Sequence, residues 1–180
     1  MRIIGGEFKG YRFNPPANKW PTRPTTDISK EGLYNILSNR IDFEDIKFLD
    51  LFGGTGSHCY ECISRGCKDA TYVDKFQGCV TFATVMREKL NIKDYLRIYK
   101  MNVFTFIKRC EEQYDYIFAG PPYPLKNIPE IPDLILAKNM LTQNGFLVLE
   151  HNPNVNLSNH PNLVSQRNYG QTIFSFFEPT

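Results

Sequence analysis

Short apolar runs alternate with helix-like segments from Phe48 to Glu150, and this alternation is the feature that most constrains the fold. The runs that we expect to form strands are Phe48–Leu51, Ala70–Val73, Leu96–Tyr99, Tyr114–Phe118 and Phe146–Glu150. Helices are expected between them over residues 57–65, 77–90, 103–111 and 131–140. Such alternation implies a parallel sheet with helices on both faces, which binds ligands beyond the carboxyl ends of its strands. One rim of the sheet should therefore be lined by Asp50, Asp74, Met101, Asn102, Gly120 and Glu150.

Both ends of the chain depart from this alternation. Two last strands, near residues 163–168 and 172–178, face each other across Tyr169–Gln171 and predict an antiparallel hairpin. At the other end, residues 1–24 predict a hairpin of Arg2–Ile4 with Tyr11–Phe13, followed by a proline-rich linker. Residues 25–180 should form the main body of one compact domain. Its first helix is expected to begin at a capping cluster and to reach residue 39, with an apolar stripe of Ile28, Leu33, Ile36 and Leu37.

The composition excludes several classes of protein. No apolar run approaches the length of a membrane span, and Met1–Gly6 is too short in its apolar part for a signal peptide, so we expect a cytoplasmic protein. The cysteine count of five is odd, which argues against a disulfide framework. Cys59 and Cys62 have the spacing of half a zinc site, but no second ligand pair follows, so no metal is expected.

The basic residues are concentrated near the N-terminus. The whole chain has a net charge of +2, whereas residues 1–30 hold six bases and two acids. Aromatic side chains at Tyr11, Phe13 and Trp20 are interleaved with these bases. This pattern fits a surface that contacts phosphates, and it fits a solvated hairpin equally well.

A glycine-rich turn follows the first strand of the alternation. Gly53, Gly54 and Gly56 lead directly into the next helix, where they can let the backbone approach a ligand. Asp74 lies 18 residues beyond Gly56, and a carboxylate there can accept both ribose hydroxyls of a nucleoside or can cap a helix. The spacing is that of neither a dinucleotide-binding loop nor a P-loop.

Two other strand ends carry polar side chains that suit this nucleoside. The side chain of Asn102 can pair with an adenine edge or cap the following helix. Asp50 is expected to orient the ligand from below.

A Pro-Pro-aromatic turn follows a later strand, at Gly120–Tyr123. Rigid prolines can hold hydrogen-bond acceptors that align an exocyclic amine for attack, and Tyr123 offers a face on which a flipped base can stack. The alternative is an ordinary turn with a core tyrosine. After a nucleoside-binding loop, this turn indicates a methyltransferase that uses S-adenosylmethionine to modify an amino group of a base.

Several segments together carry a more specific likeness, namely Ile3–Gly6, Arg23–Asp27, Asp50–Gly56, Val73–Asp74, Pro121–Tyr123 and Tyr169–Gly170. They resemble the RsmD-like methyltransferases, which modify the N2 amine of a guanine in 16S ribosomal RNA, the family target being guanine 966. The resemblance spans essentially the whole chain. It implies the fold of a class I S-adenosylmethionine-dependent methyltransferase, an α/β architecture with a Rossmann-like, doubly wound sheet of seven strands and an antiparallel last hairpin.

The resemblance also implies the roles of individual residues. S-adenosylmethionine would be held by Asp50, Phe52, Gly53, Gly54, Gly56, Asp74, Asn102 and Thr26. The target base would be held by Gly120, Pro121, Pro122 and Tyr123, and the RNA by Arg2, Lys9, Arg12, Arg23 and Tyr123. The residues from Arg23 to Asp27 would close over the pocket. The expected partner is 16S ribosomal RNA or the assembling small subunit, with a monomeric protein.

Gly120 departs from the family pattern, which has an aspartate before the two prolines. Loss of one aligned acceptor costs roughly 10²–10³ in rate. Glu150 at the next strand end is a candidate replacement. The departure leaves two other hypotheses open, a catalytically weak RNA-binding module that acts in ribosome assembly and a DNA amino-methyltransferase. The second would need a target-recognition region that this chain does not supply.

Overall fold

The computed structural model describes residues 1–180 and contains one sheet of seven strands in the order β3-β2-β1-β4-β5-β7-β6. β1 to β5 are parallel, whereas β7 is antiparallel to both β5 and β6. The strands are β1 (Lys47–Leu51), β2 (Asp69–Asp74), β3 (Leu96–Lys100), β4 (Tyr114–Ala119), β5 (Leu141–His151), β6 (Leu163–Tyr169) and β7 (Thr172–Phe177). The predicted parallel sheet and the antiparallel last hairpin are therefore confirmed.

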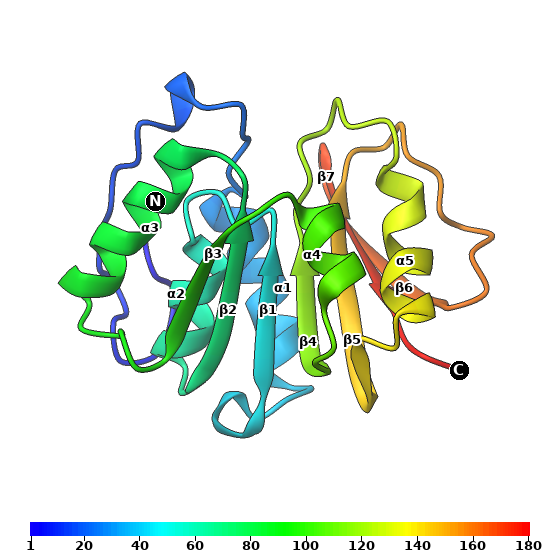
Figure 1. The fold of residues 1–180 in the computed structure, drawn as a ribbon, viewed down its shortest axis with the longest axis horizontal. Coiled ribbons are helices and arrows are strands. Elements are labelled where there is room, and N and C mark those ends of the chain that lie inside the picture. Colours follow the sequence, from blue (N-terminus) through cyan, green and yellow to red (C-terminus); the bar gives the residue numbers. More distant parts are fainter.

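Helices cover both faces of this sheet, as Figure 1 shows for α4 in front and α1 behind. The helices are α1 (Asp27–Ser38), α2 (Ser57–Ser64), α3 (Gln77–Lys89), α4 (Val103–Arg109) and α5 (Ile131–Ala137), with short 3-10 turns η1 (Ala17–Lys19), η2 (Phe43–Asp45) and η3 (Ile128–Glu130). Successive strand residues point to opposite faces, which divides the buried side chains into two cores. Tyr116 belongs to the core that includes residues of α1, α2 and α3, and its neighbour Ile117 belongs to the core that includes residues of α4 and α5.

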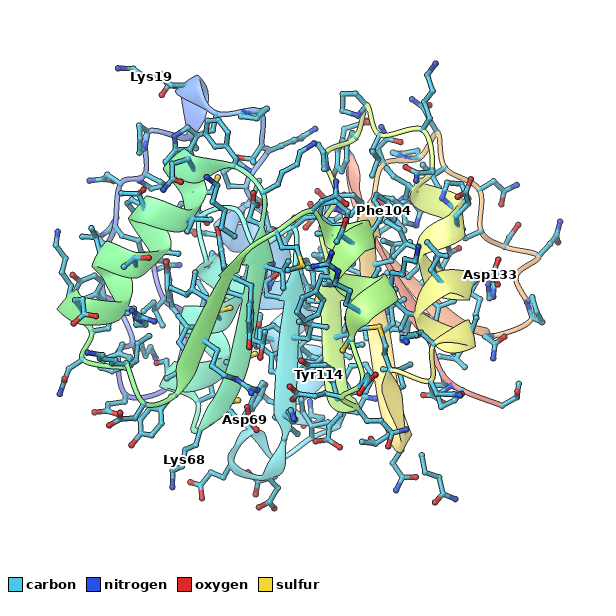
Figure 2. All side chains as sticks on the ribbon, in the orientation of Figure 1. Lys19, Lys68, Asp69, Phe104, Tyr114 and Asp133 are labelled. Carbon is cyan, nitrogen blue, oxygen red and sulfur yellow. The ribbon has the colours of Figure 1, made fainter.

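The carboxyl ends of β1 to β5 meet at one edge of the sheet, the upper edge in Figure 1. η1 and the connection from β4 to α5 rise above the same edge. Figure 2 shows Phe104, in the first turn of α4, near this upper edge, whereas Lys68 and Asp69 lie at the opposite edge. A ligand site at the upper edge would thus draw residues from most of the chain.

The N-terminal segment is built onto this body by backbone pairing. Arg2 and Arg12 form an isolated antiparallel bridge, and the Ile3 N–H donates to the Tyr11 carbonyl at 3.0 Å. The predicted pairing is present, but as a single bridge rather than two strands. The linker that follows contains η1, and the Trp20 ring lies 5.7 Å from that of Phe82 on α3.

A buried ion pair fixes the N-terminal segment to the helices. Lys30 Nζ on α1 lies 3.3 Å from Glu61 Oε2 on α2, and both side chains are 0% exposed. Glu61 also accepts hydrogen bonds of 2.9 Å from the N–H groups of Ile4 and Gly5, while Lys30 donates to the carbonyl of Arg2 at 2.7 Å. Paired in this way, two charges are tolerated where water is absent.

Some predicted details are wrong. Ile28 is 79% exposed, although the sequence pattern places it in the apolar stripe of the first helix. Side chains two positions apart on a helix point to nearly opposite sides. Because the ion pair of Lys30 turns this side chain inward, Ile28 points outward. The helix expected to end at residue 140 ends at Ala137, because Asn139 adopts a positive φ of 52°. None of the helices is long and apolar enough to span a membrane.

Candidate functional site

A cavity lies at the carboxyl edge of the sheet, lined by 23 residues and enclosing about 980 Å³ of empty space, its open mouth included. Its lining comes from the ends of the central strands, the first turn of α4 and the segment Pro21–Thr25. The predicted site residues that line it are Arg23, Asp50, Phe52, Gly53, Gly54, Asp74, Asn102, Gly120 and Pro122. Glu150, also expected at this rim, lines it too, and Met101 does not.

The glycine loop is shaped by the aromatic residues behind it. A Cβ atom on Gly53 would lie 2.3 Å from the Tyr72 ring, and one on Gly56, at a φ of 80°, would lie 2.3 Å from the Tyr60 oxygen. Both contacts are far too short for a real side chain. These two glycines are therefore required by packing inside the protein, whereas the Cβ position of Gly54 meets only the Phe52 carbonyl, at 3.8 Å.

Phe52 forms an apolar wall of the cavity together with Phe104, their ring centroids 6.1 Å apart. Its φ of 60° lies in the left-handed region, which is uncommon for any residue other than glycine. Such strain is kept where the surroundings require one particular backbone path. Here that path carries the chain from β1 into the turn at residues 53–56.

Asp74, at the end of β2, is positioned by two backbone donors. Its Oδ2 accepts from Gly54 N–H at 2.9 Å, and its Oδ1 accepts from Phe76 N–H at 2.8 Å. A carboxylate has about four acceptor positions, so each oxygen keeps capacity for one more donor. The side chain is 6% exposed and faces the cavity, where it can receive ligand hydroxyl groups.

Asn102 uses only part of its side chain within the protein. Its Oδ1 caps α4 by accepting from the N–H groups of Phe104 and Thr105, at 2.9 and 3.3 Å. The Nδ2 group makes no hydrogen bond within the chain. The helix-capping role is thus confirmed, and the amide donor remains available at the cavity wall.

Three carboxyl groups line the cavity, those of Asp50, Asp74 and Glu150. Burial, with the nearby carboxylates of the other two, raises the pKa of Asp50 to about 8. Burial also raises the pKa values of Asp74 and Glu150. A positive charge in the cavity would favour the ionised forms of these acids, and S-adenosylmethionine carries a sulfonium and an ammonium group. The residues present therefore fit this cofactor.

A hydrogen-bonded chain of five side chains lies beside the cavity. The Thr25 hydroxyl donates to Glu150 Oε2, and it lies 3.1 Å from His58 Nε2. The hydroxyl of Tyr123 donates to Glu150 Oε1 at 3.3 Å. On the far side of the imidazole, Nδ1 lies 3.3 Å from the Tyr34 hydroxyl. Glu150 is thus held from both oxygens, although it is only 4% exposed.

The same chain sets the tautomer of His58. Thr25 has one hydroxyl hydrogen, which it gives to the carboxylate of Glu150, so it must accept from His58 Nε2–H. Nδ1 is then an acceptor, and it shares the single hydroxyl hydrogen of Tyr34 with the His58 carbonyl. Burial lowers the pKa of His58 well below its usual value, which agrees with a neutral ring. The ring also stacks on Phe118 with centroids 3.7 Å apart.

The Pro-Pro turn lies next to this chain. Pro122 lines the cavity, Pro121 is buried beneath it, and Tyr123 is half-buried. The guanidinium carbon of Arg23 lies 5.1 Å from the centre of the Tyr123 ring, so one face of the ring is already covered. A stacked base would need the other face or a displaced Arg23.

Comparison with known proteins places the chain in a family. The family model described as conserved hypothetical protein 95 matches residues 1–178. The chain belongs to this family. Ribosomal RNA small subunit methyltransferase D from Buchnera aphidicola is 30% identical over 159 residues, which cover 87% of this chain and 78% of that protein. The predicted resemblance to the RsmD-like family is therefore confirmed.

Solved structures agree with the fold. A hypothetical protein from Thermus thermophilus matches with a TM-score of 0.85 and 25% identity, over 99% of both chains. An RNA methyltransferase from Salinibacter ruber, solved with S-adenosyl-L-homocysteine, matches with a TM-score of 0.67 at 9% identity, over 86% of this chain and 92% of that one. The RsmD-like chain thus has the class I methyltransferase fold.

Several residues that the RsmD-like pattern implied do not line the cavity, namely Arg2, Lys9, Arg12, Thr26, Gly56, Pro121 and Tyr123. Thr26 instead caps α1 by accepting from Ser29 N–H at 3.2 Å, and its neighbour Thr25 faces the cavity. Arg2 lies within 4.0 Å of the acids Asp27 and Glu31.

The structure adds His58 to the site and gives Thr25, rather than Thr26, the position that faces the cavity. No Ser or Cys forms a nucleophilic pattern with His58 in the sequence, and Thr25 belongs to the segment from Arg23 to Asp27 that is predicted to close over the pocket. The only signal in the sequence is position. His58 is the second residue of the helix after the glycine loop, and Thr25 directly precedes Thr26, the N-cap of α1. Thr25 meets Glu150 across 125 positions of sequence and His58 across 33, so both contacts depend on the tertiary structure.

Proposed function

We propose that this protein transfers a methyl group from S-adenosylmethionine to the N2 amine of a guanine in 16S ribosomal RNA. The observation that carries the proposal is the carboxyl-lined cavity beside the Pro-Pro-Tyr turn in a chain of the RsmD-like family. The name of the Buchnera relative, a ribosomal RNA small subunit methyltransferase, supports the RNA substrate. Guanine 966, the family target, is the proposed position.

The cavity offers the groups that this cofactor requires. When bound, S-adenosylmethionine supplies an electrophilic methyl group on a sulfonium centre. We assign the ribose hydroxyls to the unused acceptor positions of Asp74, and the adenine edge to the free Nδ2 group of Asn102. Gly54 presents open backbone to the ligand, and Asp50 lies in the cavity floor.

The RNA would approach from the side of the Pro-Pro turn. Pro122 and Tyr123 border the place where a flipped base can enter, and Arg23 is exposed above Tyr123. Lys9 and Arg12 are exposed and make no ion pair, so they are free to contact phosphates. Tyr123 then contributes a stacking face once Arg23 moves to a phosphate.

The test is methyl transfer to small ribosomal subunits purified from cells that lack the enzyme. Labelled S-adenosylmethionine should mark the 16S RNA, and nucleoside analysis should yield N2-methylguanosine at the proposed position. Calorimetry with S-adenosylhomocysteine measures cofactor binding separately. Binding without any labelled RNA, both for this protein and for Gly120→Asp, would reject the proposed reaction.

Gly120 favours one competing function, a cofactor-binding RNA module that acts in ribosome assembly without efficient turnover. The family's side-chain acceptor is absent at this position. Under this alternative, Gly120→Asp gains labelling activity that the unaltered protein lacks. Under the proposed function, the unaltered protein itself turns over.

A further inference from the structure

We propose that Glu150 supplies the acceptor carboxylate that position 120 lacks, and that Thr25 and Tyr123 are the residues that position it. The inference rests on the proposed function, since it names the group that receives the amine hydrogen in that reaction. Nothing in the Pro-Pro turn itself offers a charged acceptor. The geometry around Gly120 identifies where one is found instead.

Glu150 reaches the space beside the missing side chain. A Cβ atom on Gly120 would lie 3.9 Å from Glu150 Oε2, and its nearest neighbour would be the Phe118 ring at 3.0 Å. The two residues belong to adjacent parallel strands or their ends, because β4 ends at Ala119 and pairs with β5. The carboxylate on β5 therefore occupies the region toward which an aspartate at position 120 would project.

The contacts of Glu150 leave it available for a substrate hydrogen. Thr25 donates to Oε2 and Tyr123 donates to Oε1, one protein donor for each oxygen. Each oxygen keeps a second acceptor position. With both ends of the carboxylate fixed, the acceptor is held in one orientation before the substrate arrives, which is the condition under which electrostatic stabilisation is largest.

The charged groups near Glu150 also suit a proton acceptor. Arg23 is the nearby cation, and Asp50 is the nearby carboxyl group of the same cavity. His58 is neutral, and Thr25 separates it from the carboxylate. Burial raises the pKa of Glu150, while the hydrogen bonds from Thr25 and Tyr123 oppose that rise. A general base is most effective when its pKa lies near the working pH.

The proposed step moves one methyl group to the amine and one proton to Glu150. Glu150 accepts a hydrogen bond from the exocyclic amine and so aligns the nitrogen lone pair. The nitrogen forms a bond to the methyl carbon while the carbon–sulfur bond breaks, and the electron pair of that bond stays on sulfur. The amine nitrogen, now positively charged, releases one proton to Glu150, which later passes it to solvent.

The kinetic test compares Glu150→Gln with the unaltered protein on small ribosomal subunits. The amide keeps the size of the side chain but removes its charge and its ability to take a proton. We expect kcat to fall about 10²-fold, the lower end of general-base effects, with an unchanged Kd for S-adenosylhomocysteine. Glu130→Gln, at an exposed glutamate without side-chain partners, is the matched control and should leave kcat unchanged.

A second kinetic experiment restores the aspartate that the family pattern has at position 120. Adding Gly120→Asp to the Glu150→Gln background should recover at least about tenfold of the lost rate, because the new carboxylate enters the same region. A purely structural role for Glu150 predicts no such recovery. Loss of rate with no recovery in the double variant, or less than threefold loss in the single variant, overturns the proposal.

A binding arm needs no turnover and separates the two possible failures. The probes are guanosine and inosine 5′-monophosphates, of which only guanosine carries the N2 amine, added to protein saturated with S-adenosylhomocysteine. A charged acceptor should favour guanosine about tenfold or more, and Glu150→Gln should abolish most of this preference. Absence of the preference, or its survival in Glu150→Gln, rejects the role of Glu150. Absence of RNA methylation with the preference intact rejects the proposed function alone.

Discussion

The Lys30 ammonium group and the Glu61 carboxylate lie 3.3 Å apart with both side chains wholly buried. Removing one partner of a buried pair leaves an uncompensated charge, which typically costs about 3–5 kcal/mol. Glu61→Gln should lower the free energy of unfolding by about this amount in urea titrations, and Lys30→Met should lower it by less, because Glu61 keeps its ion pair with Arg65 at 3.0 Å. The exposed Glu7→Gln in the same segment is the control and should change it by less than about 0.5 kcal/mol. Equal, small effects in all three variants would show that the pair contributes little.

The raised pKa of Asp50 predicts a pH dependence of stability. This pKa rises from 3.8 to about 8 in the folded protein, chiefly through burial. Between these values the folded state holds a proton that the unfolded state has released, so the free energy of unfolding decreases as pH rises from about 4 to about 8. Asp50→Asn should be increasingly stabilising over this range and nearly neutral at its acid end.

Thermal unfolding of the ligand-free protein at several pH values measures this effect. Asp94→Asn, at an exposed turn, is the control and should follow the unaltered protein at every pH. If Asp50→Asn also runs parallel to the unaltered protein, Asp50 does not hold its proton.

Two buried tyrosines predict opposite effects of the same chemical change. The Tyr60 hydroxyl has no hydrogen-bond partner, whereas that of Tyr34 lies 3.2 Å from the His58 carbonyl and 3.3 Å from Nδ1 of that residue. Tyr60→Phe should therefore leave stability unchanged or raise it by about 1 kcal/mol, and Tyr34→Phe should lower it by about 1 kcal/mol. Each variant is the control of the other in chemical denaturation. If Tyr60→Phe lowers stability and Tyr34→Phe does not, the hydroxyl of Tyr60, and not that of Tyr34, makes the stabilising hydrogen bond.

The exposed bases of the N-terminal segment predict a salt dependence of RNA binding. Neutralising one phosphate contact lowers the slope of log K against log salt by about 0.7–0.9. Lys9→Ala and Arg12→Ala should each reduce the slope for 16S RNA by about this amount. Arg97→Ala is the control, because Arg97 already pairs with Asp69 and Glu112. An equal reduction of the slope in all three variants would indicate that the RNA is attracted by the overall charge of the protein and not by the N-terminal bases.

The fold followed from the sequence because strands and helices alternate with distinct periods, and strand ends of a parallel sheet must share an edge. That rule was enough to bring Asp50, Asp74 and Gly120 to one cavity. It could not separate Thr25 from Thr26, because the choice of cap decides which of two adjacent threonines faces inward. The burial of Lys30 was equally hidden, since its partner Glu61 lies on another helix.

The hydrogen bond between Thr25 and Glu150 ties a border of the cavity to the acid on β5. Residues 21–25 therefore line the cavity and also support Glu150, the proposed acceptor. A movement of residues 21–25 away from the cavity, to let the used cofactor leave, would also break the hydrogen bond from Thr25 to Glu150. Glu150 would then be correctly oriented for methyl transfer only while residues 21–25 close the cavity.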